Sequence, residues 1–467
     1  MLSINVENNF DQIKHYCGLV GIYSDKLRNI PQDLFYTLFT LQHRGQEGAG
    51  IAYEKDGNIT VYKDLGSVPA VLSKYLSLER LTHVGIGHVK YSTKGGNKIE
   101  NVQPLYAACN KGHIAIAQNG TITNAAEIKK SLVEIGAIIQ STTDTELVLH
   151  LLSRTKKDTF VDTLKDVLRR IEGALTFVMM HDNELIASRD PHGFMPLWIG
   201  KKDGITVVAS ETCALDILQI TDYREVMPGE IIRVTEKGVE STYIEQRKLS
   251  FCIFELVYFA RPDSYVFGRS VYQMRKKMGM ALAEADEADN IKGDLVMSVP
   301  DSGNYAAIGY ALRSGLPFEY GLSRNHYVGR SFIMPSQAER ELVVRMKLNP
   351  IREVVAGKVI IMVDDSLVRG TTSKIIVKML REAGAKEIHL RLSSPEVKCP
   401  CYFGIDITSR KELISNRLDN KGIAEYIGAD SVKFLPVEKL KECVDAGDNF
   451  CCGCFDGKYS VKIEGEN

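Results

Sequence analysis

No stretch of this 467-residue chain approaches the roughly 18–20 consecutive apolar residues that a membrane-spanning helix needs. The first sixteen residues also lack the long apolar core of a secretory signal. Positive and negative side chains nearly balance, at a net charge of −1, so charge gives no reason to expect nucleic acid or an anionic membrane as a partner. No internal repeat or low-complexity segment is present. What is left is an ordinary globular composition, with a length that suggests two or three domains.

Cysteine, in contrast, is plentiful, with ten residues in the chain. Because no secretory signal is present, we expect a reducing compartment, the cytoplasm, where thiols serve metal binding or catalysis more often than disulfides. Four of the ten lie close to the C-terminus: Cys443, Cys451, Cys452 and Cys454.

The first cysteine, Cys17, opens the alternating apolar stretch "CGLVGIYS". One interpretation is that Cys17 is a small core residue, which is the usual place of a free cysteine. The other is that residues 1–16 are removed, so that the α-amino group of Cys17 lies beside its own thiol and activates it as a nucleophile. Position 17 alone does not decide between the two.

The first half of the chain is typical of short strands joined by hairpins. Asp56-Gly57, Asp182-Asn183 and Asp203-Gly204 each separate two apolar runs and predict tight turns. Helices are predicted over 31–42, opening with Pro31, and over 124–135, opening with the capping pattern Asn124-x-x-Glu127. Hairpins combined with blocks of helix favour an α+β domain of antiparallel sheets faced by helices.

From about residue 251 the pattern changes to apolar runs that end in polar turns and lead into helical sequence. The runs are "GDLVMSVPDSG", "GKVIIMVDDS" and "EIHLRLSSP", and one of the helices is predicted over 373–384. Strands that alternate with helices indicate a parallel sheet, with binding at the carboxyl ends of the strands. We place the boundary between the two halves near residues 240–252.

The stretch "VIIMVDDSLVRGTTS", residues 359–373, predicts a phosphate-binding loop. A buried strand ends in two carboxylates, a loop with hydroxyls and a glycine follows, and a helix then begins. Backbone N–H groups at a helix N-terminus favour an anion, and two adjacent acids suit the diol and Mg²⁺ of a sugar phosphate. The alternative is that the hydroxyls only cap the helix, but capping uses one hydroxyl and the loop offers four.

This loop resembles the phosphoribosylpyrophosphate-binding motif of type I phosphoribosyltransferases. Further stretches along nearly the whole chain are similar to the glutamine phosphoribosylpyrophosphate amidotransferases, in their iron–sulfur-containing branch. The matching stretches are "CGLVGIYS", "LQHRGQEGAGIA", "GIGHVKYST", "IAQNGTI", "STTDTE", "CIFELVYFARPDS", "SVPDSG", "YVGRSFIMPSQAERELVVRMKLNP" and "CYFGID".

The resemblance implies a chain of three parts. Residues 1–16 would be a removed propeptide, and 17–245 an α+β N-terminal-nucleophile glutaminase domain with αββα layers. Residues 246–467 would be an α/β phosphoribosyltransferase domain with a mostly parallel sheet and a C-terminal cluster-binding segment. The implied reaction moves the amide nitrogen of glutamine to phosphoribosylpyrophosphate and gives 5-phosphoribosylamine, glutamate and pyrophosphate, the first committed step of purine synthesis.

For glutamine, the resemblance implies Cys17 as nucleophile and Asn119 with Gly120 as oxyanion donors. Asp144 would bind the α-amino group, Lys90 the carboxylate, and Arg44 and Tyr91 would line the pocket. Alternatives exist for several of these: Asn119-Gly120 as a type I′ turn, Thr143-x-x-Glu146 as a capping box, and Arg44 or Tyr91 as solvated loop residues.

For phosphoribosylpyrophosphate, the resemblance assigns Mg²⁺ to Ser302, Asp364 and Asp365. The substrate-binding residues it implies are Asp364, Asp365, Ser366, Gly370, Thr371, Thr372, Ser373, Arg330 and Lys347. A loop over 326–350 would close over pyrophosphate, although Arg345 could also belong to an ordinary solvated face.

The resemblance also implies one [4Fe–4S] cluster. Cys451-x-x-Cys454 has a spacing that can grip one metal centre, and the family's cysteine motifs supply Cys252 and Cys401. Cys399 and Cys452 would be bystanders. Zinc suits four cysteines equally well, so the two metals stay open at this stage.

Three competing functions deserve weight. Glucosamine-phosphate or asparagine synthesis would share the glutaminase half, but the two-acid loop argues against both. A paralogue that binds phosphoribosylpyrophosphate as a regulator without turnover is the third, favoured by Lys90 and His326, where the family usually has arginine. The resemblance further implies purine nucleotides as feedback inhibitors and a homotetramer.

Overall fold

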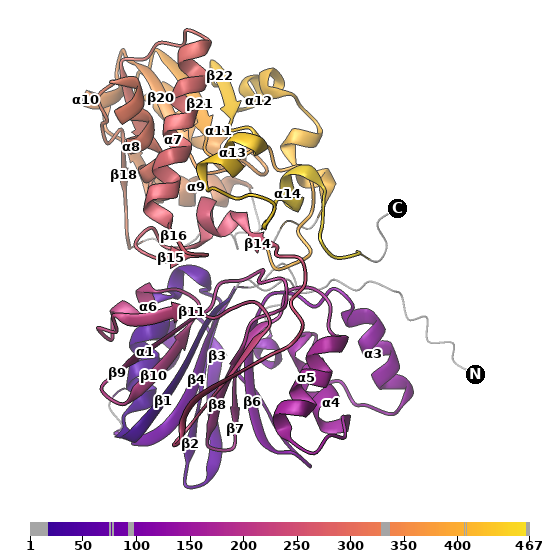
Figure 1. The fold of residues 1–467 in the computed structure, drawn as a ribbon. Coiled ribbons are helices and arrows are strands. Elements are labelled where there is room, and N and C mark those ends of the chain that lie inside the picture. Colours follow the sequence, from indigo (N-terminus) through magenta and orange to yellow (C-terminus); the bar gives the residue numbers. More distant parts are fainter. Residues whose placement is uncertain are drawn as a thin grey trace. The chain divides into compact units, whose positions relative to one another are not determined.

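The computed structural model describes residues 17–73, 76, 79–91, 98–327, 337–405, 407 and 409–463 (Figure 1). Contacts divide the chain into two units. The first comprises residues 1–251, 401–406 and 459–467, and the second comprises 252–400 and 407–458. The predicted domain boundary after residue 245 stays a prediction, and the predicted propeptide 1–16 lies outside the described residues. Among the described helices, none is both long and apolar enough to cross a membrane.

The first unit contains two antiparallel sheets. The seven-stranded sheet has the order β11-β9-β10-β1-β4-β2-β3. Its strands are β1 (Gly18–Arg28), β2 (Gly48–Lys55), β3 (Asn58–Leu65), β4 (Thr82–Lys90), β9 (Trp198–Lys202), β10 (Ile205–Ala209) and β11 (Asp222–Glu225). The six-stranded sheet has the order β13-β12-β8-β7-β6-β5. Its strands are β5 (Leu105–Cys109), β6 (Gly112–Asn119), β7 (Thr176–His181), β8 (Glu184–Ser188), β12 (Glu230–Thr235) and β13 (Gly238–Tyr243).

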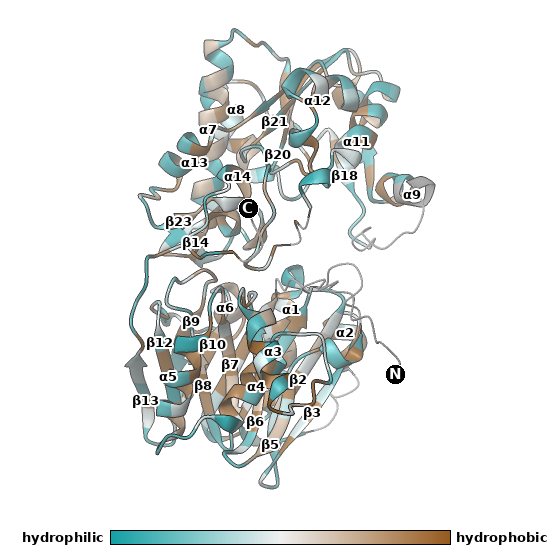
Figure 2. Ribbon diagram, turned by 90° about the vertical axis from the view of Figure 1, so that its right-hand side faces the viewer, coloured by the Kyte–Doolittle hydropathy of each residue, from teal (hydrophilic) through white to brown (hydrophobic). Residues whose placement is uncertain are grey.

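Alternation along the strands explains how these sheets form layers. On β1, Leu19 packs into the core between the sheets with Val178 of β7, whereas Val20 packs into the core beneath the first helix with Leu34. Successive side chains of a strand point to opposite faces, so each sheet buries both faces. In Figure 2 the strands of the two sheets are largely brown, the colour of hydrophobic residues.

Helices cover the outer face of each sheet. Those on the seven-stranded sheet are α1 (Ile30–Thr40), α2 (Val68–Leu72) and α6 (Cys213–Asp216). Those on the six-stranded sheet are α3 (Ala125–Glu134), α4 (Thr145–Arg154) and α5 (Phe160–Arg170). Single turns of 3₁₀-helix span Gln42–Arg44 and Ile99–Asn101. The predicted αββα layering is therefore confirmed.

The three predicted hairpins are also confirmed. They join β2 to β3, β7 to β8 and β9 to β10, and Asp56, Asp182 and Asp203 have φ values of 52°, 48° and 49°. Turns of this kind need positive φ, which Asp and Gly tolerate better than most residues.

The predicted cap at Asn124 is wrong. Helix α3 begins as expected, but Asn124 makes no side-chain capping bond. Its Nδ2 donates to the carbonyl of Arg170 at 2.9 Å, and its Oδ1 accepts from the N–H of Glu172 at 3.0 Å. The side chain thus joins α3 to the segment after α5, a contact that local sequence does not encode.

The second unit is built on a four-stranded sheet of order β17-β20-β21-β22, in which every neighbouring pair is parallel. The strands are β17 (Leu295–Ser298), β20 (Val359–Asp364), β21 (Glu387–Leu392) and β22 (Ser431–Phe434). Helices α7 (Val271–Ala288) and α8 (Asn304–Ser314) contact each other. Helices α11 (Thr371–Glu382) and α12 (Asn420–Ile427) bury apolar residues against the sheet. The predicted α/β class with a mostly parallel sheet is confirmed.

The remaining elements of the second unit are short or peripheral. The helices are α9 (Gln337–Lys347), α10 (Arg352–Val355), α13 (Val437–Cys443), α14 (Gly453–Asp456) and a π-helix at Glu255–Phe259. Single turns of 3₁₀-helix span Arg410–Glu412 and Ile414–Asn416. The paired short strands are β14 (Phe251–Cys252) with β23 (Phe450–Cys451), β15 (Tyr265–Val266) with β16 (Arg269–Ser270), and β18 (Leu322–Arg324) with β19 (Leu348–Pro350).

Candidate active sites

Cys17 lies immediately before β1 and is completely buried. Its backbone N–H donates to Asn119 Oδ1, with N and O 3.0 Å apart. Its carbonyl oxygen accepts a hydrogen bond from Arg44 Nε at 3.1 Å. The residue is therefore held on both sides of its Cα, by β6 and by the turn that follows α1.

Asn119 and Gly120 end β6 beside Cys17. Because Asn119 Oδ1 accepts from Cys17, the side chain presents Nδ2 as a donor, and Nδ2 is buried without a hydrogen-bond partner among the described residues. Gly120 has a φ of 109°, and a Cβ at this position would lie 2.5 Å from the carbonyl oxygen of Ala174. Asn119 is not among the residues with positive φ, so the pair does not form a type I′ turn. A buried, unpaired amide donor costs free energy unless a ligand satisfies it.

Burial raises the pKa of the Cys17 thiol to about 12. Smaller opposing effects come from a hydrogen bond with the Tyr91 backbone and from the charges of Lys90 and Arg44, while Glu47 raises the pKa further. The thiol is thus protonated at neutral pH, and it needs a base at hand to become a nucleophile. Tyr91 is brought to Cys17 through its main chain.

Lys90 is the last residue of β4 and is fully buried. Gly18 pairs with Val89 across the β1–β4 ladder, so Lys90 lies next to Cys17 at the end of that ladder. Burial lowers the pKa of its ammonium, and the charges of Cys17 and Glu47 oppose that effect. A buried cation beside Cys17 is suited to bind the α-carboxylate of glutamine, and this role of Lys90 stays a prediction.

Arg44 is also fully buried, so the alternative of a solvated loop residue is wrong for it. Its Nη1 donates to Glu211 Oε1 at 2.5 Å, while its Nε holds the carbonyl of Cys17. The guanidinium is therefore engaged with groups of the protein itself. Lining of the glutamine pocket by Arg44 stays a prediction.

Asp144 is buried at the start of α4, and burial raises its pKa to about 7. Its Oδ1 accepts from Gln118 Nε2 at 2.7 Å, and its Oδ2 accepts from the N–H of Ile122 at 2.8 Å. The carboxylate is thereby tied to the strand that carries Asn119. Asp144 makes no side-chain capping bond with α4.

Glu146 does not complete the capping box that the sequence suggests. It accepts from the N–H groups of Gln140 and Ser141, which precede the helix. The alternative that Thr143 and Glu146 form a capping box is therefore wrong, because Glu146 bonds to residues 140 and 141. The carboxylate of Asp144 contacts Gln118 of β6 and does not cap α4.

In the second unit, Asp364 ends β20 and Asp365 follows it, and Ser302 lies in the turn after β17. Ser298 pairs with Val363 in the parallel ladder, which brings the two carboxyl ends together. Ser302 Oγ donates to Asp364 Oδ1 at 3.4 Å. Burial raises the pKa of both acids, and the neighbouring charge of Asp365 raises that of Asp364 further. Two crowded carboxylates and a hydroxyl are oxygen donors that suit Mg²⁺, which binds through one or two carboxylates with substrate phosphates.

The loop after these acids leads into α11 as predicted. Gly370 has a φ of 75°, and a Cβ there would lie 2.9 Å from Ile414 Cδ1. Thr371, Thr372 and Ser373 then form the first turn of α11, whose unpaired N–H groups and dipole favour an anion. Ser366 donates its hydroxyl to Asp365 Oδ1. Ser366, Gly370 and the three hydroxyl residues 371–373 thus lie in one continuous segment, formed by the loop and the first turn of α11.

The predicted closing loop is described only in part. Arg330 lies outside the described residues. Lys347 ends α9, and its carbonyl accepts from the N–H of Asn325 at 2.8 Å. Arg345 Nη1 donates to Glu382 on α11 at 3.0 Å, a contact that favours the solvated-face interpretation of Arg345.

The cysteines predicted to bind a cluster lie in both units. Cys252 and Cys451 stand on the paired strands β14 and β23, and Cys454 lies in α14. Its carbonyl accepts from the N–H of Cys399 at 3.0 Å. Cys401 belongs to the first unit by contacts. Over the described part of the chain, no three His, Cys, Asp or Glu side chains form a group that could hold a metal ion, so the cluster stays a prediction.

Burial raises the pKa of Cys452 to about 12 and that of Cys443 to about 11. Both thiols lie in surroundings less polar than water, which disfavour the thiolate.

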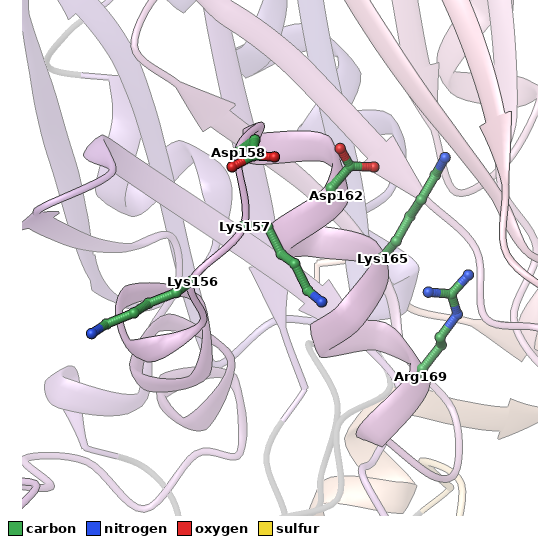
Figure 3. Close-up of a pocket in the computed structure, with 6 residues that line it drawn as sticks. All are labelled: Lys156, Lys157, Asp158, Asp162, Lys165 and Arg169. Carbon is green, nitrogen blue, oxygen red and sulfur yellow. The ribbon is translucent and has the colours of Figure 1, made fainter.

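A surface pocket of the first unit lies away from the predicted residues. Its lining consists of Lys156, Lys157, Asp158, Asp162, Lys165 and Arg169. Lys165 and Arg169 lie one turn apart on α5, and the two aspartates lie near the start of that helix (Figure 3). No predicted site residue lines this pocket, which has the mixed charge of a solvated face.

Comparison with known proteins places this geometry in a family. A model of the glutamine amidotransferase domain matches residues 92–216. The chain is 44% identical to a chloroplastic amidophosphoribosyltransferase of Vigna aconitifolia, over 98% of this chain and 94% of that protein. The chain belongs to the amidophosphoribosyltransferase family. The family's member from Bacillus subtilis strain 168 is also 44% identical, over 96% of this chain and 94% of its own.

A solved structure extends the likeness to the fold. The structure of glutamine phosphoribosylpyrophosphate amidotransferase from B. subtilis, complexed with ADP and GMP, has a TM-score of 0.89. The sequences are 43% identical, and the match covers 96% of this chain and 98% of that one. The predicted family is therefore confirmed.

Sequence reasoning missed two residues, Glu211, which contacts the arginine that holds Cys17, and Gln118, which contacts Asp144. Glu211 follows β10 as a single acid, and Gln118 precedes Asn119 as a single amide. Both are fully buried, and both reach the site through contacts between residues far apart in the chain. Only an unexpected polar residue within an apolar strand could have marked Gln118.

Proposed function

We propose that the chain transfers the amide nitrogen of glutamine to phosphoribosylpyrophosphate, giving 5-phosphoribosylamine, glutamate and pyrophosphate. The observation that carries the proposal is the contact between Cys17 and Asn119. It orders the nucleophile and leaves an unpaired buried donor beside it, in a chain that matches amidophosphoribosyltransferases over nearly its full length.

The glutaminase step begins at Cys17. Once residues 1–16 are removed, the nitrogen that now contacts Asn119 Oδ1 is the α-amino group. This amine takes the proton of the thiol, whose raised pKa keeps it protonated until a base acts. The thiolate attacks the side-chain carbonyl carbon of glutamine, and the amine returns the proton to the departing ammonia. Water then hydrolyses the γ-glutamyl thioester to glutamate.

Asn119 Nδ2 and the Gly120 N–H stabilise the oxyanion formed in that attack. Such preorganised donors supply several kcal/mol in a buried site, on the order of a hundredfold to a thousandfold in rate for each donor. The ionised carboxylate of Asp144 binds the α-ammonium of glutamine, and Lys90 binds its α-carboxylate. Together they place the amide carbon next to the thiol.

The second step takes place at the loop after β20. Asp364 and Asp365 would hold the ribose diol and, with Ser302, a magnesium ion. The loop from Ser366 to Ser373 and the basic Arg330 and Lys347 would bind the phosphates. Ammonia attacks the anomeric carbon, a C–N bond forms, and the C–O bond to pyrophosphate breaks. When bound, Mg²⁺ stabilises the charge of the leaving pyrophosphate.

We infer the regulation and the assembly of this chain from its likeness to the family. The B. subtilis structure is described with ADP and GMP, which supports purine nucleotides as feedback inhibitors here. A homotetramer in the cytoplasm and one [4Fe–4S] cluster on Cys252, Cys401, Cys451 and Cys454 complete the proposal. The cluster would be structural and oxygen-labile.

The test is pyrophosphate release by the purified chain, with glutamine or with ammonium chloride as nitrogen source. We expect release with both for the native chain. Cys17→Ala should abolish glutamine-dependent release and leave ammonia-dependent release near its native rate, because the two reactions use separate residues. Absence of release from the native chain with either source would favour the regulator, and equal loss of both activities in a folded Cys17→Ala variant would contradict the assignment of Cys17.

A further inference from the structure

Glu211 is a fully buried carboxylate that the proposed chemistry does not use. It lies two residues after the end of β10 in the first unit. Its Oε1 accepts from Arg44 Nη1 at 2.5 Å and contacts His43 Nε2 at 2.7 Å. Its Oε2 accepts from the thiol of Cys213 at 3.8 Å. Three side chains thus contact this one carboxylate, more than a residue of a connecting turn requires.

The partner of Glu211 reaches the nucleophile. Arg44 uses Nη1 for Glu211 and Nε for the carbonyl oxygen of Cys17. Arginine presents donors in a rigid planar fork, so the position of the carboxylate sets the position of the Nε–H that holds Cys17. The neighbouring Ser210 adds a second tie, because its Oγ accepts from the N–H of Leu19 at 2.9 Å.

We propose that Glu211 and Arg44 are positioning residues for the glutaminase step, with Glu211 fixing the guanidinium that in turn fixes the main chain of Cys17. The inference rests on the proposed role of Cys17. Removal of the leader leaves Cys17 attached to the chain on one side only, so its carbonyl becomes the sole covalent anchor of the nucleophile. A hydrogen bond at that carbonyl then controls where both the amine and the thiol lie.

The pair also sets the charge around Cys17. The charged groups that act on the thiol are Lys90, Arg44 and Glu47. Because Arg44 donates to Glu211, its charge is balanced by a carboxylate whose pKa the two neighbouring bases hold well below its usual range. Loss of Glu211 would leave an uncompensated buried cation close to the α-amino group, and a nearby cation lowers the pKa of an amine.

The experiment compares Glu211→Gln with a matched control, Glu225→Gln. Arg189 is buried and donates to Glu225 Oε1 at 2.9 Å, so each substitution strips a carboxylate from a buried arginine, but Arg189 makes no described hydrogen bond to Cys17. For Glu211→Gln we expect kcat for glutamine hydrolysis to fall on the order of tenfold to a hundredfold. The acid limb of the kcat profile should also move to lower pH, by about one unit. Glu225→Gln should change neither.

Two further variants separate positioning from charge and from misfolding. Arg44→Gln combined with Glu211→Gln removes both charges, so the acid limb should return toward its native position while kcat stays low. His43→Gln leaves the Arg44–Glu211 contact in place and should keep kcat within about twofold of native. Thermal unfolding of all variants shows which of them fold.

Three outcomes would overturn the inference: an unchanged kcat and profile in folded Glu211→Gln, equal effects of Glu211→Gln and Glu225→Gln, or a lower kcat with no movement of the acid limb. If Cys17→Ala keeps glutaminase activity, the proposed function itself fails. If Cys17→Ala is inactive while Glu211→Gln is native in every respect, only the positioning role fails.

Discussion

The backbone nitrogen of Cys17 and the side-chain oxygen of Asn119 lie 3.0 Å apart, although 102 residues separate them in the chain. This one contact orients the Asn119 amide, because its oxygen is used by Cys17 and its nitrogen is left without a described partner in a buried position. In the proposed reaction, the amide would hold Cys17 with its oxygen and donate to the oxyanion with its nitrogen.

Asn119→Asp should separate these two functions. The aspartate retains an oxygen that accepts from the nitrogen of Cys17, but it replaces the oxyanion donor with a charge that repels the oxyanion. We expect kcat for glutamine hydrolysis to fall by about a hundredfold to a thousandfold, with little change in KM and no change in ammonia-dependent synthesis. A loss confined to KM, measured by glutamate release, would show that Asn119 binds the ground state instead.

Asp144 predicts a specific pH dependence of glutamine binding. Burial raises its pKa to about 7, so the carboxyl gains a proton as the pH falls through 7 and can then no longer pair with the α-ammonium. KM for glutamine should rise about tenfold for each pH unit below 7, while kcat at saturating glutamine reports other groups.

Asp144→Asn should raise KM at neutral pH and remove this slope. Asp190→Asn is the matched control, because Asp190 is another buried carboxyl of the first unit whose pKa burial raises, and its Oδ1 accepts from the N–H of His192 at 3.0 Å. A native slope in Asp144→Asn, or its loss in Asp190→Asn, would assign the titration to a different residue.

Lys90→Arg should lower KM for glutamine by about tenfold, the equivalent of 1–2 kcal/mol, because a guanidinium holds a carboxylate through two parallel hydrogen bonds. Arg44, the alternative partner, is already engaged with Glu211 and Cys17. Lys63→Arg is the control, since Lys63 is a partly buried lysine of the same sheet whose Nζ donates to Val102 at 2.6 Å. If Lys90→Arg and Lys90→Ala both keep the native KM, residue 90 does not bind the carboxylate.

Asp364→Asn and Asp365→Asn should each reduce synthesis from glutamine and from ammonia alike, by about a hundredfold or more, because each would remove a proposed diol and Mg²⁺ contact. Asp294→Asn is the control: it lies at the amino end of the same sheet, where Oδ2 accepts from the N–H of Val359 at 2.8 Å. The measurement is pyrophosphate release over a range of Mg²⁺ concentrations. Native synthesis at low Mg²⁺ in either variant would exclude that acid from the sugar site.

The cysteine assignment predicts iron and acid-labile sulfide, four of each per chain for one [4Fe–4S] cluster. Cys401→Ser should lower both contents and the visible absorbance of the anaerobically purified protein. Cys443→Ser should leave them unchanged, because Cys443 is not one of the four proposed ligands. Zinc in place of iron, or an equal loss in both variants, would contradict the assignment.

Local sequence was sufficient for much of the fold and for the course of the predicted phosphate loop. The Asp-Gly turns, the alternation along β1 and the apolar runs of β17, β20 and β21 are encoded by residues within a few positions of one another, so hairpins, layers and the parallel sheet were predictable. The phosphate loop is likewise continuous, because Asp364 through Ser373 follow a single strand.

The predicted glutamine site is different, since only tertiary structure brings its parts together. Cys17, Asn119 and Asp144 come from three separate elements, and the resemblance to a family, not the local pattern, connected them in the sequence. The orientation of the Asn119 amide, the raised pKa of Asp144 and the engagement of Arg44 with Glu211 depend on burial and on contacts across 102, 26 and 167 positions. Propensity and periodicity describe neighbours along the chain, whereas desolvation and hydrogen-bond direction are set by whatever the folded chain places around a group.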